Sequence, residues 1–282
     1  MLCETCGGRV PPARRECGTC HTPVGAPALR AGVRTRAVRG VGVAASVAVV
    51  GVLVADLARA LWPLAGGRMA ERAVLTGHRA LFELAQLVEL IIPVLHVGTV
   101  IVAGVLVIIW LYRARTNLEA FPGASPTLSG GWAIAGWFVP FANLVIPCRV
   151  MVSIARDSVR RSRTPWLVGI WWPSWLVYWL VAGRIDRRDA RDYPLLMAEP
   201  ASPADYRTYV DHYAAALGSE LMLLPAGGVA AAALIILIRR ISVAQEARIA
   251  RGATGPVPPG MTVPAPTVPG GAPTGGDATI GA

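Results

Sequence analysis

Lysine is absent from this 282-residue chain, and charged residues of all kinds make up only 16% of it. A soluble domain carries about 25% charged residues. Hydrophobic residues reach 54% and the mean hydropathy is +0.50, so the shortage of charge argues against an ordinary soluble domain. The net charge of +10 comes from arginines that flank apolar runs. This placement favours an anionic membrane surface over nucleic acid as the partner of the basic residues.

Sequence signatures of catalysis are also missing. The chain has no phosphate-binding glycine loop, no nucleophile elbow and no Cys/His dyad, which are the marks of nucleotide-binding proteins and of hydrolases. We therefore expect a protein that is not an enzyme. The N-terminus opens with polar residues and cysteines instead of a charged segment followed by an apolar one, so no secretory signal is expected.

Four apolar runs are long enough to cross a bilayer as helices. They cover residues 38–61, 91–112, 166–183 and 217–238. A helix rises 1.5 Å per residue, so about 20 residues cross a hydrocarbon core of about 30 Å. We expect lipid bilayer around these four segments.

Proline and glycine predict where these helices end. Pro63 and Gly66-Gly67 should stop the first span, and residues 69–90 then read as an amphipathic helix in the membrane interface. Ser202 and Pro203 have the residue types of a helix N-cap and first position. The tyrosines that follow share one face, as a second interfacial helix requires.

A fifth apolar segment, residues 131–158, contains Pro140 and Pro147 with Asn143 between them. Neither half is long enough to cross a bilayer. Arginine-rich short loops favour the cytoplasm, and five crossings would place Arg239-Arg240 outside. The sequence therefore predicts an all-α bundle of four transmembrane helices plus a re-entrant or interfacial helical hairpin over 131–158. Five transmembrane helices are the alternative.

The expected organisation has four parts. Residues 1–25 form a cysteine module, 26–37 a basic linker, 38–251 the membrane domain, and 252–282 a tail rich in proline and glycine. The tail has too few large apolar residues to fold and is expected to be disordered. Both termini are expected on the cytoplasmic side of the plasma membrane.

The cysteine module has the strongest motif in the chain. Two C-x-x-C pairs, ten residues apart, can present four thiolates to one tetrahedral Zn²⁺; they are Cys3, Cys6, Cys17 and Cys20. Four sulfur ligands leave no open coordination position, so the zinc would be structural. Disulfides or redox-active pairs are the alternative, which a reducing cytosol disfavours. His21 is a further candidate ligand. The zinc knuckle and the tail are candidate binding sites for a cytosolic protein partner.

Polar residues inside the apolar runs are the next candidates, because ionisable groups are rare at membrane depth. Glu89 and His96 are seven residues apart and share a helix face, which would suit a proton or ion relay. Asp56 and Arg59 are three apart and are expected to pair. The alternative is that the acidic groups lie at the interface and are hydrated. Asn143 could bond carbonyls freed by proline or line a substrate cavity.

Tryptophan gathers in the run 166–183. Trp171, Trp175 and Trp179 recur at every fourth residue and so share one helix face. Such a stripe could form an aromatic cage, but it is more often a packing surface or an interfacial belt.

Four segments carry a resemblance to a known family: LYRARTNLEAF at 111–121, the broken segment 131–158, VGIWWPSWLVYWL at 168–180, and LIRRISVAQEARI at 237–249. The most specific part is the core formed by Gly136, Trp137, Phe138, Val139, Pro140, Asn143 and Pro147. Over about residues 40–250 the chain resembles the membrane family catalogued as domain of unknown function 4328. The resemblance implies a membrane fold and no particular activity.

Two functions are consistent with these observations. The first is a non-enzymatic, membrane-anchored scaffold or regulatory module that carries a cytosolic zinc knuckle. The alternative is a small transporter or channel subunit that uses the proline-broken segment, because discontinuous helices commonly build binding sites at the membrane midplane.

Overall fold

The computed structural model describes residues 1–3, 7–12, 14–18, 22–76, 79–159, 164–196 and 203–253. Five features predicted from the sequence lie outside these ranges: Cys6, Cys20, His21, the N-cap Ser202, and all but the first two residues of the C-terminal tail.

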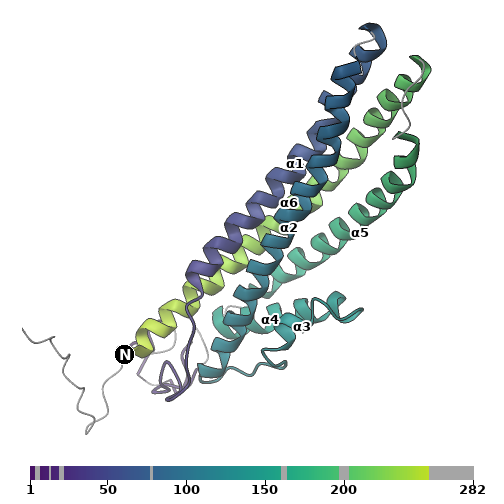
Figure 1. Cartoon of the computed structure of the whole chain (residues 1–282). Helices are drawn as coiled ribbons and strands as arrows, with labels where there is room; N and C mark the ends of the chain where they lie inside the picture. Colours follow the sequence, from purple (N-terminus) through teal and green to yellow (C-terminus); the bar gives the residue numbers. More distant parts are fainter. Residues whose placement is uncertain are drawn as a thin grey trace, which may run out of the picture.

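Four long helices form the body of the molecule: α1 (Arg39–Thr76), α2 (Arg79–Asn117), α5 (Thr164–Leu196) and α6 (Pro203–Ala253). They run alternately in opposite directions along one elongated bundle (Figure 1), in which α1 packs on α6 and α2, and α5 packs on α6. The N-terminal residues lie beside the C-terminal end of α6 (Figure 1). We call this the termini end of the bundle.

The segment between α2 and α5 folds into short pieces. These are η1 (Leu118–Ala120), α3 (Trp132–Ala135), η2 (Ala142–Leu144) and α4 (Ile146–Val159). In Figure 1, α3 and α4 lie beside the lower half of the bundle, near the termini end. Gly136 permits the tight turn, because a Cβ there would lie 2.5 Å from the Ile146 side chain. With helices of 4 and 14 residues, neither arm of segment 131–158 is long enough to cross a bilayer.

Three helices are long and apolar enough to cross a membrane: Arg39–Thr76, Glu83–Ala120 and Arg207–Ala253. They contain three of the predicted spans, 38–61, 91–112 and 217–238. The prediction of an all-helical membrane bundle is therefore confirmed, and the described residues contain no strand, only two isolated β-bridges. The fourth predicted span, 166–183, lies in α5, which is not among the three because its tryptophans, proline and serine lower its apolar character.

The predicted end of the first helix at Pro63 is wrong, since α1 continues unbroken to Thr76 with Pro63 buried inside it. Gly66 is a packing residue instead of a terminator. A Cβ at this position would lie 2.7 Å from the ring of Tyr213, so glycine lets α6 approach α1 closely.

The prediction of two separate interfacial helices is also wrong, because the long helices continue through both segments. Residues 79–90 belong to α2 and residues 203–216 belong to α6. Tyr209 and Tyr213 are buried in a cluster with Ala70 and Ala73 of α1, so these tyrosines face a neighbouring helix. Tertiary packing extends all three helices beyond their most apolar windows.

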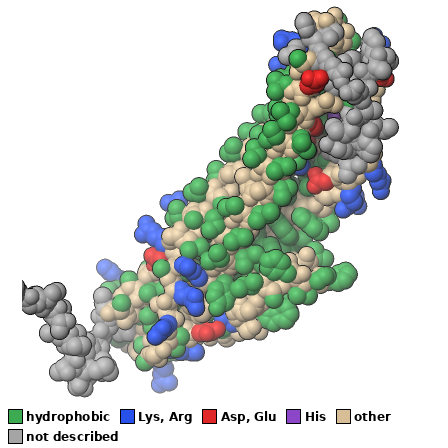
Figure 2. Space-filling model, viewed as in Figure 1, with side chains coloured by type: hydrophobic (Ala, Val, Ile, Leu, Met, Phe, Trp, Pro, Cys, Tyr) green, Lys and Arg blue, Asp and Glu red, His purple; other side chains and the backbone are tan. Residues whose placement is uncertain are grey.

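Exposed apolar side chains cover the middle of the bundle. Figure 2 shows hydrophobic side chains along the centre of the visible face and arginines toward both ends. Large side chains such as Val47, Leu95 and Ile101 are more than half exposed. Exposure to water would cost about 25 cal/mol per Å² of apolar surface. Lipid as the surrounding solvent removes this cost.

Candidate functional site in the helix bundle

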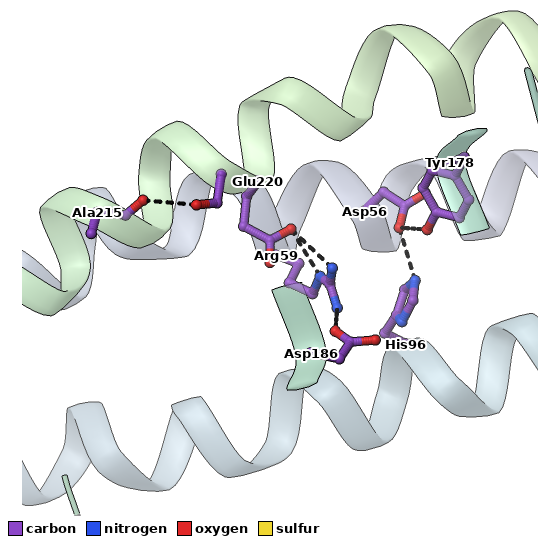
Figure 3. Close-up of polar contacts among 8 residues, drawn as sticks. Asp56, Arg59, His96, Tyr178, Asp186, Ala215 and Glu220 are labelled. Carbon is purple, nitrogen blue, oxygen red and sulfur yellow. Dashed lines mark hydrogen bonds and ion pairs between the residues drawn. The ribbon is translucent and has the colours of Figure 1, made fainter. Parts of the chain in front are cut away.

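A carboxylate at the centre of the bundle connects three helices. Asp56 of α1 is only 7% exposed. Its Oδ1 accepts a hydrogen bond from the Tyr178 hydroxyl of α5 at 2.8 Å, and His96 Nε2 of α2 lies 2.8 Å from the same oxygen (Figure 3). A buried charge with two such partners is held in one position.

One turn further along α1, Arg59 forms a second polar layer. Its Nη2 lies 3.0 Å from Oε2 of Glu220 in α6, and its Nη1 lies 3.3 Å from Oδ1 of Asp186 in α5 (Figure 3). The predicted pairing of Asp56 with Arg59 is wrong, because each residue bonds to partners on other helices. The alternative in which the acidic groups are hydrated at the interface is wrong for Asp56, which is buried, and Glu220 is likewise only 8% exposed.

Glu89 belongs to a third layer and does not join His96. Its Oε2 accepts a hydrogen bond of 2.7 Å from Trp62 Nε1, while His96 faces Asp56. Asn143 lies in η2, and its side chain makes no hydrogen bond within the described ranges. The structure therefore places the three predicted polar residues at three separate locations and adds Asp56 and Tyr178 as the groups that meet His96.

A cavity of about 280 Å³ lies next to Asp56 and Tyr178. All four long helices line it, together with Trp137 of the broken segment. The lining is mostly aliphatic and aromatic: Val49, Val52, Leu53, Val100, Ala103, Gly104, Val107, Trp137, Trp171, Trp175, Gly227, Ala230, Ala231 and Leu234. Of the described residues in the lining, only Asp56 has a charged side chain, and Tyr178 adds a hydroxyl group.

Tryptophans form one wall of the cavity. The ring of Trp137 meets those of Trp172 and Trp175 edge-on, with centroids 6.2 and 5.8 Å apart. Trp172 and Trp175 stack at 4.9 Å, and Trp171 is 1% exposed. The wall thus joins α5 to Trp137 of the family core, whereas Trp179 is 51% exposed. The packing interpretation therefore holds for Trp171 and Trp175, and the cage interpretation stays a prediction.

Tyr178 and Gly227 belong to this candidate site and were not predicted from the sequence. A Cβ at Gly227 would lie 3.1 Å from the Tyr178 ring and 3.9 Å from Asp56 Oδ2, so glycine leaves room for both groups. The sequence does contain a signal for Tyr178: it is a polar residue three positions after Trp175, and residues at this spacing are neighbours on a helix surface. No feature of the local sequence marks Gly227, because its role depends on a neighbouring helix.

The cysteine module is built from a repeat. The Cys3 amide donates to the Gly8 carbonyl at 2.8 Å, and fourteen residues later the Cys17 amide donates to that of Thr22 at 3.0 Å. Val10 and Val24 likewise donate to Met1 and Arg15, each at 2.9 Å. Cys3 and Cys17 are both buried, in one cluster with Val10 and Val24. The described residues do not bring together three metal-binding side chains, but two of the four cysteines lie outside them.

Buried polar groups attach the basic linker to the bundle. Asn117 of α2 accepts a 2.7 Å hydrogen bond from the Arg36 amide and donates to the Arg36 carbonyl at 2.9 Å. It also donates to Gln245 of α6 at 3.0 Å, and Gln245 donates to the Ala114 carbonyl at 2.9 Å. Arg248 donates to the Ala28 carbonyl at 3.0 Å. We call these groups the linker cluster.

The family described as domain of unknown function (DUF4328) matches residues 74–243. The match covers more than half of the chain, so the chain belongs to this family. It is narrower than the sequence resemblance suggested and leaves out α1 up to Ala73. No curated protein and no solved structure is significantly similar to the chain.

Proposed function

We propose that this chain is a non-enzymatic membrane protein with four crossings that presents a zinc-bound cysteine module at the cytoplasmic face. The observation that carries the proposal is the linker cluster. A flexible tether would need no buried contacts, yet the linker backbone at Ala28 and Arg36 is bonded to two different helices. These contacts of the linker support a module held at a fixed place on the bundle, as a regulatory or scaffolding element would be.

The count of four crossings rests on the positions of the helix ends. Arg248 of α6 contacts Ala28, so the end of the last helix lies beside the linker that precedes the first. An even number of crossings meets this requirement. The length of α5, 33 residues, is enough to serve as the fourth. The arginines of the linker before α1, and Arg239 and Arg240 that follow the apolar part of α6, favour cytoplasmic termini.

Zinc is supported by the repeat within the module. Tetrahedral zinc sites of this kind use two matched knuckles, each delivering two sulfurs from a tight turn. The backbone amides of Cys3 and Cys17 donate equivalent hydrogen bonds, which form two turns of similar geometry. In the described part of the module, only four buried or half-buried apolar residues form a cluster of its own, so a metal would supply most of its stability.

Metal analysis of the purified full chain tests this proposal. We expect one zinc per chain, lost in the double variant Cys3→Ser with Cys6→Ser. Proteases should then cut the N-terminal module, while the helical circular dichroism of the bundle stays unchanged. Cys148→Ser is the matched control, because this cysteine is remote from the module, and it should keep its zinc. A wild-type chain without metal, or an equally protected double variant, would contradict the proposal.

The alternative is a small transporter or channel subunit that uses the proline-broken segment. It is favoured by the position of Trp137, which carries that segment to the wall of the cavity. Flux of a solute in proteoliposomes, lost on Asn143→Leu, would support this function over the first. Absence of flux for a panel of monovalent ions and small organic ions would count against it.

A further inference from the structure

We propose that the cavity beside Asp56 is a binding site for a lipophilic organic cation, that is, an ammonium group attached to an apolar or aromatic body. This inference goes beyond the proposed anchoring function and rests on different residues, so either can fail alone.

The charge of the ligand follows from the charges around the cavity. Among the described residues that line it, Asp56 is the one with a charged side chain, and both of its close contacts use Oδ1. Its Oδ2 receives no hydrogen bond from the described part of the chain and is the oxygen nearer Gly227. A cation in the cavity would therefore lie within reach of a carboxylate oxygen that no described group already contacts.

The organic nature of the cation follows from the walls. A metal ion such as Ca²⁺ needs six or more oxygen ligands, whereas this cavity offers one carboxylate and one phenol. Trp137, Trp171, Trp175 and Tyr178 present aromatic surface instead. Aromatic faces attract alkylammonium groups, most strongly when both partners are desolvated.

The depth and size of the cavity fit a ligand that enters from the lipid. Its lining covers residues 49–56, 100–107 and 227–234, which are close to the centres of the spans 38–61, 91–112 and 217–238. About 280 Å³ is roughly twice the 150 Å³ of an engineered cavity that binds benzene. Benzyltrimethylammonium is therefore a suitable probe, and neopentylbenzene is its uncharged counterpart of nearly the same shape.

Binding of both probes to the purified full chain tests the site, with tryptophan fluorescence as the readout because three tryptophans line the cavity. Each probe is compared between the wild-type chain and Asp56→Asn in the same detergent, so that partitioning into micelles cancels. The substitution should weaken binding of the cation about tenfold or more and leave binding of neopentylbenzene within twofold.

Two further variants make the result specific. Asp186→Asn removes a carboxylate that is 60% exposed and lies outside the lining, so it should change binding of the cation far less than Asp56→Asn. Gly104→Leu adds a side chain to the lining where a Cβ meets nothing within 4 Å, and it should weaken binding of both probes. This variant keeps the test decisive if Asp56→Asn does not fold.

Equal binding of both probes to the wild-type chain would overturn the proposal, as would unchanged binding of the cation in Asp56→Asn or Gly104→Leu. The cavity would then be apolar space filled by lipid. Binding of the cation that depends on Asp56 in a chain without zinc would uphold this inference while contradicting the proposed function.

Discussion

The molecule contains two buried polar regions of opposite character. The linker cluster at the termini end consists of the amides Asn117 and Gln245, the guanidinium of Arg248, and backbone carbonyls. The site around Asp56 consists of ionisable side chains from all four long helices. One region is built mainly from neutral amides and a guanidinium, and the other contains the carboxylates of Asp56, Asp186 and Glu220.

The difference shows how buried polarity serves structure or function. In the linker cluster the donors and acceptors of both amide side chains form hydrogen bonds with other groups of the chain. A structural network requires such complete pairing. At Asp56 one carboxylate oxygen faces Gly227 and a cavity. A buried carboxylate does not stabilise a fold when one of its oxygens lacks a partner. We therefore attribute this arrangement to ligand binding.

Gln245→Leu should have the largest effect on stability. The substitution leaves the Asn117 amide, the Ala114 carbonyl and the Ser158 hydroxyl without their present partner. Each buried unsatisfied group costs about 1–3 kcal/mol, so we expect a loss of about 2–5 kcal/mol in thermal unfolding in detergent. Val243→Ala, on the exposed side of the same helix, should cost less than 1 kcal/mol. Equal effects would show that the linker cluster is not structural.

Gly66→Ala should have the next largest effect and extends the comparison to the far half of the bundle. The added Cβ would lie 2.7 Å from the Tyr213 ring, and overpacking costs about 1–3 kcal/mol. Gly67→Ala is the matched control, since its Cβ would lie at an ordinary 3.5 Å from Tyr213. Alanine is the better helix former by about 1 kcal/mol, so this control should be neutral or stabilising. Two equally destabilised variants would refute the close approach of α6.

Asp56→Asn should change stability by less than about 1 kcal/mol, because the amide oxygen can still accept from Tyr178 while the cost of burying a charge is removed. Thermal unfolding of this variant beside Gln245→Leu compares the two regions directly. A loss as large as that of Gln245→Leu would mean that Asp56 is structural.

The smallest effect concerns Cys148, which lies in α4 outside the candidate spans. Burial raises the pKa of its thiol above the usual value, so less of the reactive thiolate is present at a given pH. Alkylation of the Cys148 peptide, followed by mass spectrometry, should require a higher pH in the folded chain than in the denatured chain. Coinciding pH profiles would contradict the burial of this thiol.

Much of the bundle could be predicted, because long apolar runs indicate segments in contact with lipid and arginines indicate segments in contact with water. Pro203 begins α6 as its residue type indicated, and segment 131–158 contains no long helix. The continuity of α1 through Pro63 could not be predicted, since it depends on the fit of Tyr213 against Gly66. Likewise, the partner of Asp56 is set by which helices adjoin α1, and local spacing pointed to Arg59 instead.

The position of the chain ends relative to the membrane is the most direct test of the proposed topology, in which four helices cross and both termini are cytoplasmic. Accessibility of epitope tags in sealed cells and in permeabilised cells distinguishes the outcomes, with tags at each terminus and between α5 and α6. We expect both terminal tags to be reached only after permeabilisation and the tag between α5 and α6 to be reached in sealed cells. Terminal tags on opposite sides of the membrane would contradict this topology, because Arg248 and Ala28 could then not be neighbours.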